Sequence, residues 1–192
     1  MSRMSAGILY LHGFCSSPES WKARVLGNAL RERGLGDRFL CPALSPVPNE
    51  AIAQAEAIIE SWDGELTLVG SSLGGFYSTY LAEKHGLRAV LVNPAVVAPL
   101  LLNAYIGTQK NLHTGDTFEF TAAHIDQLRT LECAAITPAR YLLLVETGDE
   151  VLDYRDAVRR YAGSRQEVFE GGDHSFTRFP DLLPQLFEFC RL

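Results

Sequence analysis

The sequence predicts an α/β fold, in which a mostly parallel sheet carries helices on both of its faces. Short apolar runs alternate along the chain with longer amphipathic stretches, as they do in repeated βαβ units. The 192 residues are 47% hydrophobic and 21% charged, the composition of an ordinary globular domain. A chain of this size buries roughly 70% of the surface that its unfolded form exposes, so it needs neither disulfide nor metal to fold. We expect one domain over residues 1–192, with an insertion at about 94–137.

Most of the expected strands are short apolar runs, and the expected helices have an apolar stripe at helical spacing. In chain order, the predicted strands are 7–11, 39–44, 66–69, 89–92, 141–146 and 167–170. The predicted helices are 18–33, 51–62, 73–85, 122–131, 154–161 and 181–189. Local signals support the early boundaries. Ser17 can cap the first helix, Pro18 fits its first position and Gly34 can end it, while Pro46 and Pro48 close the second strand.

Between residues 94 and 137 the alternation of strands and helices lapses. This segment is too long for an ordinary connection between two elements. We expect an insertion with one or two helices, lying above the functional site as a small lid.

Charge and cysteine usage argue against several classes of function. A net charge of −6 without a basic patch argues against nucleic-acid binding, which depends on clustered Lys and Arg. Four scattered cysteines without a C-x-x-C pair argue against a zinc site or a disulfide framework, and fit a reducing compartment. These cysteines are Cys15, Cys41, Cys133 and Cys190.

No segment predicts targeting or stable membrane insertion. The N-terminus has one Arg and then only a short apolar run, which does not predict a signal peptide. The longest apolar stretch, 89–106, is interrupted by two asparagines and two prolines, so we interpret it as a buried strand followed by a loop. We expect a cytoplasmic protein, and the sequence gives no sign of its oligomeric state.

The run Gly70-Ser71-Ser72-Leu73-Gly74 matches the G-x-S-x-G pattern of a serine nucleophile. A serine hydroxyl is a weak nucleophile until a base accepts its proton, so it must be exposed beside one. The pattern exposes the serine at a sharp strand-to-helix turn, where small flanking residues avoid a collision. A predicted strand precedes this run and a predicted helix follows it. A Walker loop would need Lys in place of Phe76, and a dinucleotide fingerprint would need Gly in place of Ser72. Ser72 is the candidate nucleophile, and a plain turn with two serines is the alternative.

The base and the orienting acid should follow Ser72 in chain order. His174 comes directly after the last predicted strand, where a loop reaches the carboxyl edge of the sheet. Asp149 follows the penultimate strand at the same edge, and would orient the imidazole and stabilise its charged form. Asp153, its rival, opens the next helix and fits an N-cap better. Asp173 is adjacent to His174 in sequence and is badly placed to reach the ring.

A tetrahedral intermediate needs two preorganised hydrogen-bond donors. The first candidate is the backbone N–H of Leu73, at the start of the helix after Ser72, where the helix dipole also helps. The second comes from the loop after the first strand, where Gly13 lets the backbone turn and the Phe14 N–H is our candidate. We interpret His12 as a structural hydrogen-bonding residue rather than a base.

Five blocks of sequence together resemble the YqiA-like bacterial esterases. They are 9–14 (LYLHGF), 69–75 (VGSSLGG), 92–96 (VNPAV), 147–155 (TGDEVLDYR) and 170–174 (EGGDH). The resemblance spans essentially the whole chain, and the fourth block is quite specific. Two positions depart from it: Cys15, where Asn is usual, and Asp173, where Asn is common.

The resemblance implies a three-layer α/β-hydrolase fold with a six-stranded sheet. The second strand would lie at one edge and the strand before the nucleophile near the middle. It further implies a triad of Ser72, Asp149 and His174, with esterase activity on short acyl esters and acyl-CoA thioesters as further candidate substrates. No metal or cofactor is needed.

The expected partner is a small-molecule acyl ester or thioester. Val96, Val97, Leu101 and Tyr105 could cradle an acyl chain or could equally pack the lid, and Cys15 could line the pocket. Besides an esterase, two functions stay open: an acyltransferase with the same triad, and a non-catalytic module that binds a small ligand.

Overall fold

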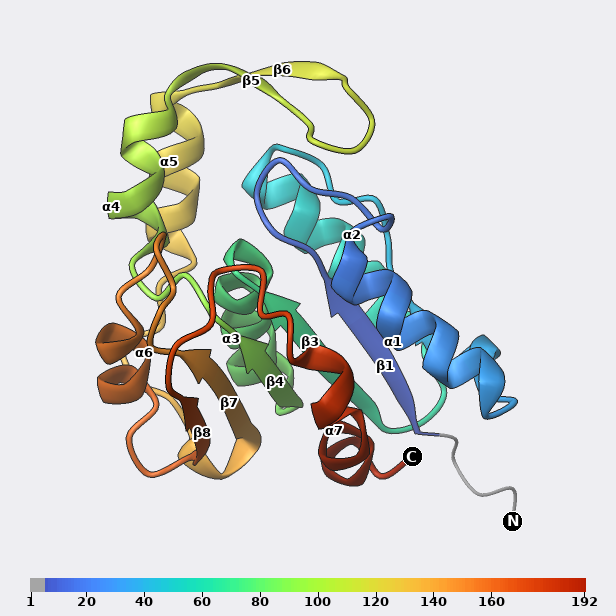
Figure 1. The fold of residues 1–192 in the computed structure, drawn as a ribbon. Helices are drawn as coiled ribbons and strands as arrows, with labels where there is room; N and C mark the ends of the chain where they lie inside the picture. The colour runs from blue at the N-terminus through green and yellow to red at the C-terminus, as the bar shows by residue number, and fades with distance from the viewer. Residues whose placement is uncertain (1–5) are drawn as a thin grey trace.

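In the computed structural model, which describes residues 6–192, six parallel strands form a sheet in the order β2-β1-β3-β4-β7-β8 (Figure 1). The strands are β1 (Gly7–Leu11), β2 (Phe39–Leu40), β3 (Leu66–Ser71), β4 (Arg88–Val92), β7 (Tyr141–Glu146) and β8 (Arg165–Phe169). The predicted fold class is confirmed, with the second strand at an edge and the strand before Ser72 near the middle. The prediction that the N-terminus is not a signal peptide includes residues 1–5, which lie outside the described residues.

Helices cover both faces of this sheet (Figure 1). The main ones are α1 (Trp21–Glu32), α2 (Pro48–Ser61), α3 (Leu73–His85), α6 (Tyr154–Arg160) and α7 (Leu183–Cys190). Short 3₁₀ turns add η1 (Gly36–Arg38), η2 (Asn103–Tyr105), η3 (Pro138–Arg140) and η4 (Phe179–Leu182). Because parallel strands are buried on both faces, their sequences are continuous apolar runs, as in β1, β4 and β7.

The hydrophobic core is divided in two by the sheet. Successive side chains of a strand point to opposite faces. On β1, Ile8 and Tyr10 pack with α1 and α7, whereas Leu9 and Leu11 pack with α2 and α3. The two layers of core hold the carboxyl ends of β1, β3, β4 and β7 side by side, where the candidate site lies.

Between β4 and β7, the chain forms what we call the insert, residues 94–137. It contains α4 (Ala98–Leu102), the antiparallel hairpin of β5 (Gly107–Lys110) and β6 (Thr117–Phe120), and α5 (Ala122–Thr130). The predicted helix at 122–131 is present as α5, a second short helix accompanies it, and the hairpin was not predicted. In Figure 1 the hairpin extends from α4 and α5 across the top of the molecule.

Several element boundaries differ from the prediction by a few residues; α2, for example, begins at Pro48 rather than at 51, and β8 spans Arg165–Phe169 rather than 167–170. β2 ends after two residues rather than at 44, because Pro42 lacks the N–H that a sheet ladder needs. α1 begins at Trp21 rather than at Pro18. Residues 18–20 form a turn instead, and the Ser17 hydroxyl accepts a hydrogen bond within it from the Glu19 N–H at 3.1 Å.

The apolar stretch 89–106 forms most of β4 and then α4 and η2, so its predicted loop contains a short helix. Over the described residues, no helix has the length and apolarity needed to span a membrane.

Candidate active site

Ser72 alone makes the turn between β3 and α3. Its φ of 54° and ψ of −120° lie in a region that residues with a side chain rarely adopt. The Ser72 N–H donates to the Val92 carbonyl at 3.1 Å, and the Ser72 carbonyl accepts from the N–H groups of Gly75 at 2.9 Å and Ala95 at 3.0 Å. The turn is therefore held from β4 as well as from α3. It has the strained strand-to-helix geometry that the G-x-S-x-G pattern predicts.

The two glycines of the pattern are required by close contact. A Cβ at Gly74 would overlap the backbone carbonyl of Leu11 on β1, and a Cβ at Gly70 would overlap the Gly74 carbonyl. α3 therefore approaches both strands at backbone distance. Any larger residue at either position would push the helix, and with it the Ser72 side chain, away from the sheet.

His174 lies on the loop between β8 and α7, and its ring reaches Asp149 at the end of β7. His174 Nδ1 and Asp149 Oδ2 are 2.8 Å apart. The other oxygen of the Asp149 carboxylate, whose side chain is only 2% exposed, accepts from the Val151 and Leu152 N–H groups, both at 2.8 Å. With Nδ1 donating to this fixed carboxylate, Nε2 is the ring nitrogen left to accept a proton. Ser72 and His174 line the same two cavities.

The rival side chains have structural contacts. Asp153 caps α6, accepting from a backbone N–H of its first turn at 2.9 Å. The Asp173 carboxylate accepts from the Phe176 N–H at 3.1 Å, within its own loop. His12 is buried, and its Nε2 accepts from the Leu44 N–H at 3.1 Å, while burial lowers its pKa. The predicted N-cap at Asp153 and the structural role of His12 are thus confirmed.

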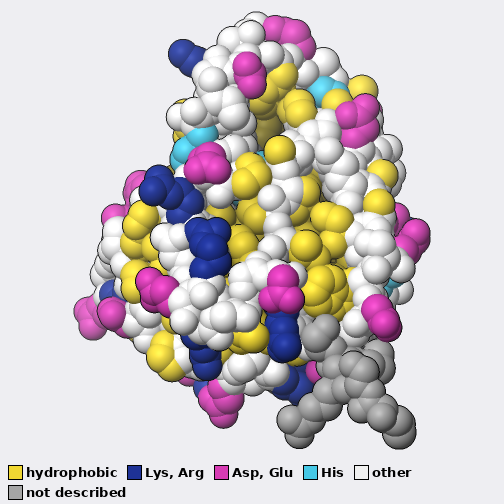
Figure 2. All heavy atoms as spheres, turned by 90° about the vertical axis from the view of Figure 1, so that its right-hand side faces the viewer, with side chains coloured by type: hydrophobic (Ala, Val, Ile, Leu, Met, Phe, Trp, Pro, Cys, Tyr) yellow, Lys and Arg dark blue, Asp and Glu magenta, His cyan; other side chains and the backbone are white. Residues whose placement is uncertain are grey.

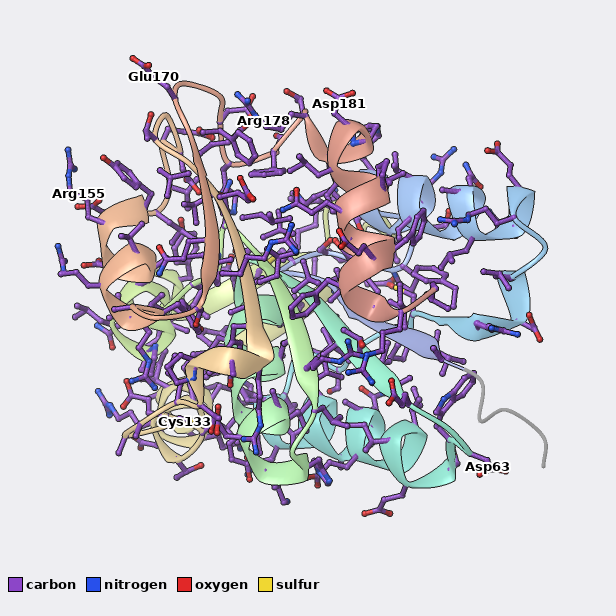
Figure 3. The ribbon with its side chains drawn as sticks, turned by 90° about the horizontal axis from the view of Figure 1, so that it is seen from below. Asp63, Cys133, Arg155, Glu170, Arg178 and Asp181 are labelled. Carbon is purple, nitrogen blue, oxygen red and sulfur yellow. The ribbon has the colours of Figure 1, made fainter. Side chains whose placement is uncertain are left out.

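A buried carboxylate that the sequence analysis did not single out anchors the loop of His174. Glu146, the last residue of β7, is completely buried. One of its oxygens accepts from the Asp173 N–H at 2.8 Å, and the other pairs with the Arg178 guanidinium, which Figure 3 shows beside the loop after β8. Asn93, at the end of β4, donates to the Asp173 carbonyl at 3.1 Å and accepts from the Glu146 N–H at 3.1 Å. In the sequence, Glu146 is marked by being a single charged residue at the end of an apolar strand.

The hairpin of the insert holds the loop that follows β1. The Leu112 N–H donates to the Cys15 carbonyl at 2.8 Å, and the Asn111 side chain donates to the Ser16 carbonyl at 2.8 Å. The ring of Phe14 packs edge-on against three aromatic rings of the insert. These are Tyr105, Phe118 and Phe120. The position of this loop therefore depends on the insert as well as on β1.

The candidate oxyanion donors lie on either side of Ser72. Leu73 follows it at the start of α3, and the loop of Phe14 comes close enough that a Cβ on Gly13 would lie 3.3 Å from the Ser72 Cβ. Within residues 6–192, neither the Phe14 N–H nor the Leu73 N–H donates to a protein acceptor. Both remain available for a substrate oxygen.

Two cavities meet at Ser72 and His174. The first, of about 530 Å³, we call the apolar cavity. Its other lining residues are Phe14, Cys15, Leu73, Ala95, Leu101, Leu102, Tyr105, Gln109, Lys110, Leu112, Val151 and Leu152. The second, of about 560 Å³, extends towards α1, and we call it the polar cavity. Its polar side chains, besides Ser72 and His174, are Tyr10, Ser16, Ser20, Lys22, Ser71, His113, Ser175 and Thr177.

Of the five predicted substrate-contact residues, the structure places three at the apolar cavity and two elsewhere. Cys15, Leu101 and Tyr105 do line the apolar cavity. The structure does not bring Val96 and Val97 there: they line a separate cavity of about 230 Å³ on the side of α6. The reason is the hydrogen bond from the Ala95 N–H to the Ser72 carbonyl, which places Ala95 beside the serine and turns the chain away after it. Burial raises the pKa of the Cys15 thiol, which disfavours the reactive thiolate form.

One family model covers nearly the whole of this chain. It is described as uncharacterised protein family UPF0227, and it matches residues 7–191, from β1 to the end of α7. The chain belongs to this family. The resemblance to the YqiA-like proteins is thereby confirmed.

Solved structures share the fold of this UPF0227 chain. Alpha/beta hydrolase domain-containing protein 10 from mouse aligns with a TM-score of 0.72 at 16% identity, covering 98% of this chain and 90% of that one. Est1E from Butyrivibrio proteoclasticus aligns with a TM-score of 0.72 at 13% identity, covering 100% and 91%. The esterase domain of a Rhodothermus marinus protein gives 0.67 at 15% identity, covering 99% and 88%. At these identities the likeness shows the fold, which is that of the α/β hydrolases.

Proposed function

We propose that this protein is a serine esterase that hydrolyses carboxylic esters of small molecules, with Ser72, His174 and Asp149 as its triad. The observation on which this rests is the strained turn at Ser72, which opens into the two cavities that also receive a His174 ring bound to Asp149. Proteins of the same fold whose descriptions name them as esterases or lipolytic enzymes support the class: Est1E, the Rhodothermus marinus domain, and LipS and LipT.

The reaction follows from these positions. Ser72 Oγ attacks the acyl carbon while His174 Nε2 takes its proton and then delivers it to the leaving oxygen. Asp149 keeps the ring oriented and stabilises its charged form. The N–H groups of Phe14 and Leu73 stabilise the oxyanion, each worth about 10²–10³ in kcat. Water, activated by the same imidazole, then releases the acid from Ser72.

We extend the proposal to the setting of the activity. The whole chain would act as one domain, with the insert as a lid over the acyl group. All four cysteines are free, which supports a reducing, cytoplasmic location. Acyl-CoA thioesters are a second substrate class to be tested beside oxygen esters.

The test is active-site labelling together with one substitution. A fluorophosphonate should form an adduct on Ser72, located by mass spectrometry of the digested protein. The Ser72→Ala variant should lose the adduct and at least about 10³-fold of its kcat on 4-nitrophenyl butyrate, because removing the nucleophile disables the triad as a unit. Ser61→Ala, at an exposed serine at the end of α2 and outside both cavities, is the control for handling and folding.

No adduct at Ser72, or undiminished turnover by Ser72→Ala, would refute the proposal. Acyl-CoA and 4-nitrophenyl esters of graded length then compare thioester with ester. Adding a small alcohol and analysing the products by chromatography tests for acyl transfer, which would give a new ester instead of the free acid.

A further inference from the structure

Building on the proposed esterase, we propose that the polar cavity receives the leaving group and selects one that bears an anion, a carboxylate or a phosphate, through Lys22. The apolar cavity then receives the acyl group. The substrate class is therefore an ester whose acyl half is apolar and whose alcohol or thiol half is negatively charged.

Both cavities open on Ser72 and His174 and have a mostly apolar lining, but they differ in the polar side chains that they contain. Apart from Gln109 and Lys110 at its edge, the apolar cavity is lined by hydrophobic side chains. The polar cavity has hydroxyl groups, Lys22 and two histidines beside the apolar side chains of Phe14, Trp21 and Leu112, and none of the described residues that line it is Asp or Glu. Among the described residues, neither cavity is lined by a carboxylate, although the chain has 23 acidic residues and a net charge of −6; the feature specific to the polar cavity is its group of hydroxyls around Lys22. Hydroxyl donors around one ammonium are suited to bind an anion.

Lys22 is placed to supply the charge. It lies in the first turn of α1, and its Nζ donates to the Ser175 carbonyl at 2.8 Å, one residue beyond His174. That bond uses one of its three N–H groups, and the other two remain for a ligand. Within residues 6–192 Lys22 forms no ion pair at contact distance, although the charges of three carboxylates act on it from farther away. Each of these carboxylates has a closer partner. Asp149 binds His174, Asp173 binds Phe176, and Glu146 binds Arg178.

The position of the His174 loop indicates which half of the ester lies in which cavity. Ser175 and Thr177, on that loop, line the polar cavity, whereas His174 is the only residue of the loop among those lining the apolar one. Since His174 must hand its proton to the leaving oxygen, the leaving group lies on the side of this loop. In Figure 2, which shows the side of the molecule where α1 lies, basic side chains gather beside a strip of hydrophobic ones.

A matched set of substrates tests this preference. The butyrate esters of 3-hydroxybenzoate, 3-hydroxyphenyl phosphate and the neutral 3-hydroxybenzamide differ mainly in the charge of the leaving group. We expect the wild-type kcat/KM to be about tenfold higher for at least one anionic ester than for the amide, as charge-assisted hydrogen bonds are the strong ones. The larger of the two ratios distinguishes a carboxylate from a phosphate ligand.

Variants then assign the preference to Lys22. Lys22→Gln should reduce the ratio of anionic to neutral kcat/KM to near one, and Lys22→Arg should retain most of it. Arg24→Gln removes the same charge from the exposed side of α1, and Lys110→Gln removes the lysine of the apolar cavity. Both should keep the wild-type ratio.

Several outcomes would overturn the inference. One is a wild-type ratio near one for both anions. Another is an equal loss on all three esters in Lys22→Gln, which would mean that Lys22 only tethers the His174 loop through Ser175. A third is loss of the preference in Lys110→Gln, which would place the anion in the other cavity. Failure of the esterase proposal itself looks different, since then no ester is hydrolysed and no adduct forms on Ser72.

Discussion

Glu146 lines neither cavity, but its contacts hold the loop that carries His174. Its carboxylate links the backbone of Asp173 to the guanidinium of Arg178, and its backbone is held by Asn93. The loop between β8 and α7 is thus fixed on both sides of the imidazole. Gly172 belongs to the same arrangement: it has a φ of +73°, and a Cβ there would overlap the Glu146 carboxylate.

Replacing this carboxylate by an amide should therefore affect both stability and rate. In Glu146→Gln the Arg178 charge loses its partner, and we expect the free energy of unfolding in urea to fall by about 2–3 kcal/mol. The kcat should fall as well, because the His174 loop is less constrained. Glu170→Gln is the control, since Glu170 is on the same loop with its side chain projecting to solvent (Figure 3), and it should stay within about 0.5 kcal/mol of wild type. A Glu146→Gln protein as stable and active as wild type would argue against this positioning role.

The proposed triad could be predicted from the sequence because each of its members stands in a short motif at the end of a strand. Ser72 lies between two glycines, and Asp149 and His174 follow the last two strands in the expected order. Lys22 and Glu146 stand in no such motif. Lys22 is one charge on an amphipathic helix, and the partners of Glu146 come from two separate segments, the end of β4 and the loop after β8, which meet only in the folded chain.

The preference for an anionic leaving group should depend on pH. Burial lowers the pKa of Lys22 to about 8, partly offset by the carboxylates of Asp173, Asp149 and Glu146. The ammonium is charged below that pH and loses its proton above it, so the preference should be greatest below pH 8 and decline as the pH rises through it. The ratio of kcat/KM for the benzoate and benzamide esters, measured from pH 6 to 10, cancels the ionisation of the triad. Tyr10, His113 and His174 are the other titratable side chains that line this cavity. A ratio independent of pH would contradict a role for the Lys22 charge.

At the scale of elements, the hairpin of the insert holds the loop of Phe14, which carries one of the two proposed oxyanion donors. The side chain of Asn111 joins both parts: it donates to the Ser16 carbonyl and accepts from the N–H groups of His113 and Thr114 at 2.9 and 3.0 Å. One residue thus shapes the tip of the hairpin and docks it on the loop of Phe14.

Truncating this residue should reduce catalysis more than stability. We expect Asn111→Ala to lower kcat for 4-nitrophenyl butyrate about tenfold, since the Phe14 N–H is held less firmly, and to lower the unfolding free energy by only about 1 kcal/mol. Thr108→Ala removes an exposed contact with Glu119 on the same hairpin and leaves the docked tip intact, so it should have little effect on either quantity. If both substitutions lowered kcat equally, the contact between Asn111 and the loop of Phe14 would not be what supports catalysis.

The helices of the chain were easier to predict than this hairpin. Helices such as α3 and α6 have a boundary signal and a buried stripe, and their predicted starts agree with the structure. The strands β5 and β6 have four residues each, are largely polar and enclose a six-residue loop. Their pairing depends on Phe118 and Phe120 reaching Phe14, a contact between segments about a hundred residues apart.

At the scale of the whole molecule, we expect the core beneath α7 to matter more for stability than for catalysis, because its residue Leu186 lines neither cavity. Leu186 on α7 is fully buried against the face that α1 also covers, away from Ser72. We expect Leu186→Ala to lower the free energy of unfolding by about 2–5 kcal/mol, because it leaves a cavity in this core. The kcat/KM of the protein that remains folded at 25 °C should not change. Glu188→Ala, at an exposed position of the same helix, is the control for stability. A large fall in kcat/KM at 25 °C would show that the core beneath α7 is coupled to the site.

The architecture itself was accessible from the sequence because its central strands are continuous apolar runs, a signature of a sheet buried on both faces. The strand order was not visible in that pattern. It came from the resemblance to a family, since the runs at 7–11, 66–69 and 89–92 do not show on their own which of them are neighbours.

The shortness of β2 has a consequence for how copies of the chain meet. A long, regular border strand would offer unpaired N–H and C=O groups as a template for a strand from another molecule. Here the border strand β2 ends at Leu40, two residues before Pro42, and Pro46 and Pro48 follow shortly after. The opposite border, β8, presents charged side chains from Arg165 and Glu167. Both borders thus have features that oppose edge-to-edge pairing, and any assembly of this chain is expected to use other surfaces than a continued sheet.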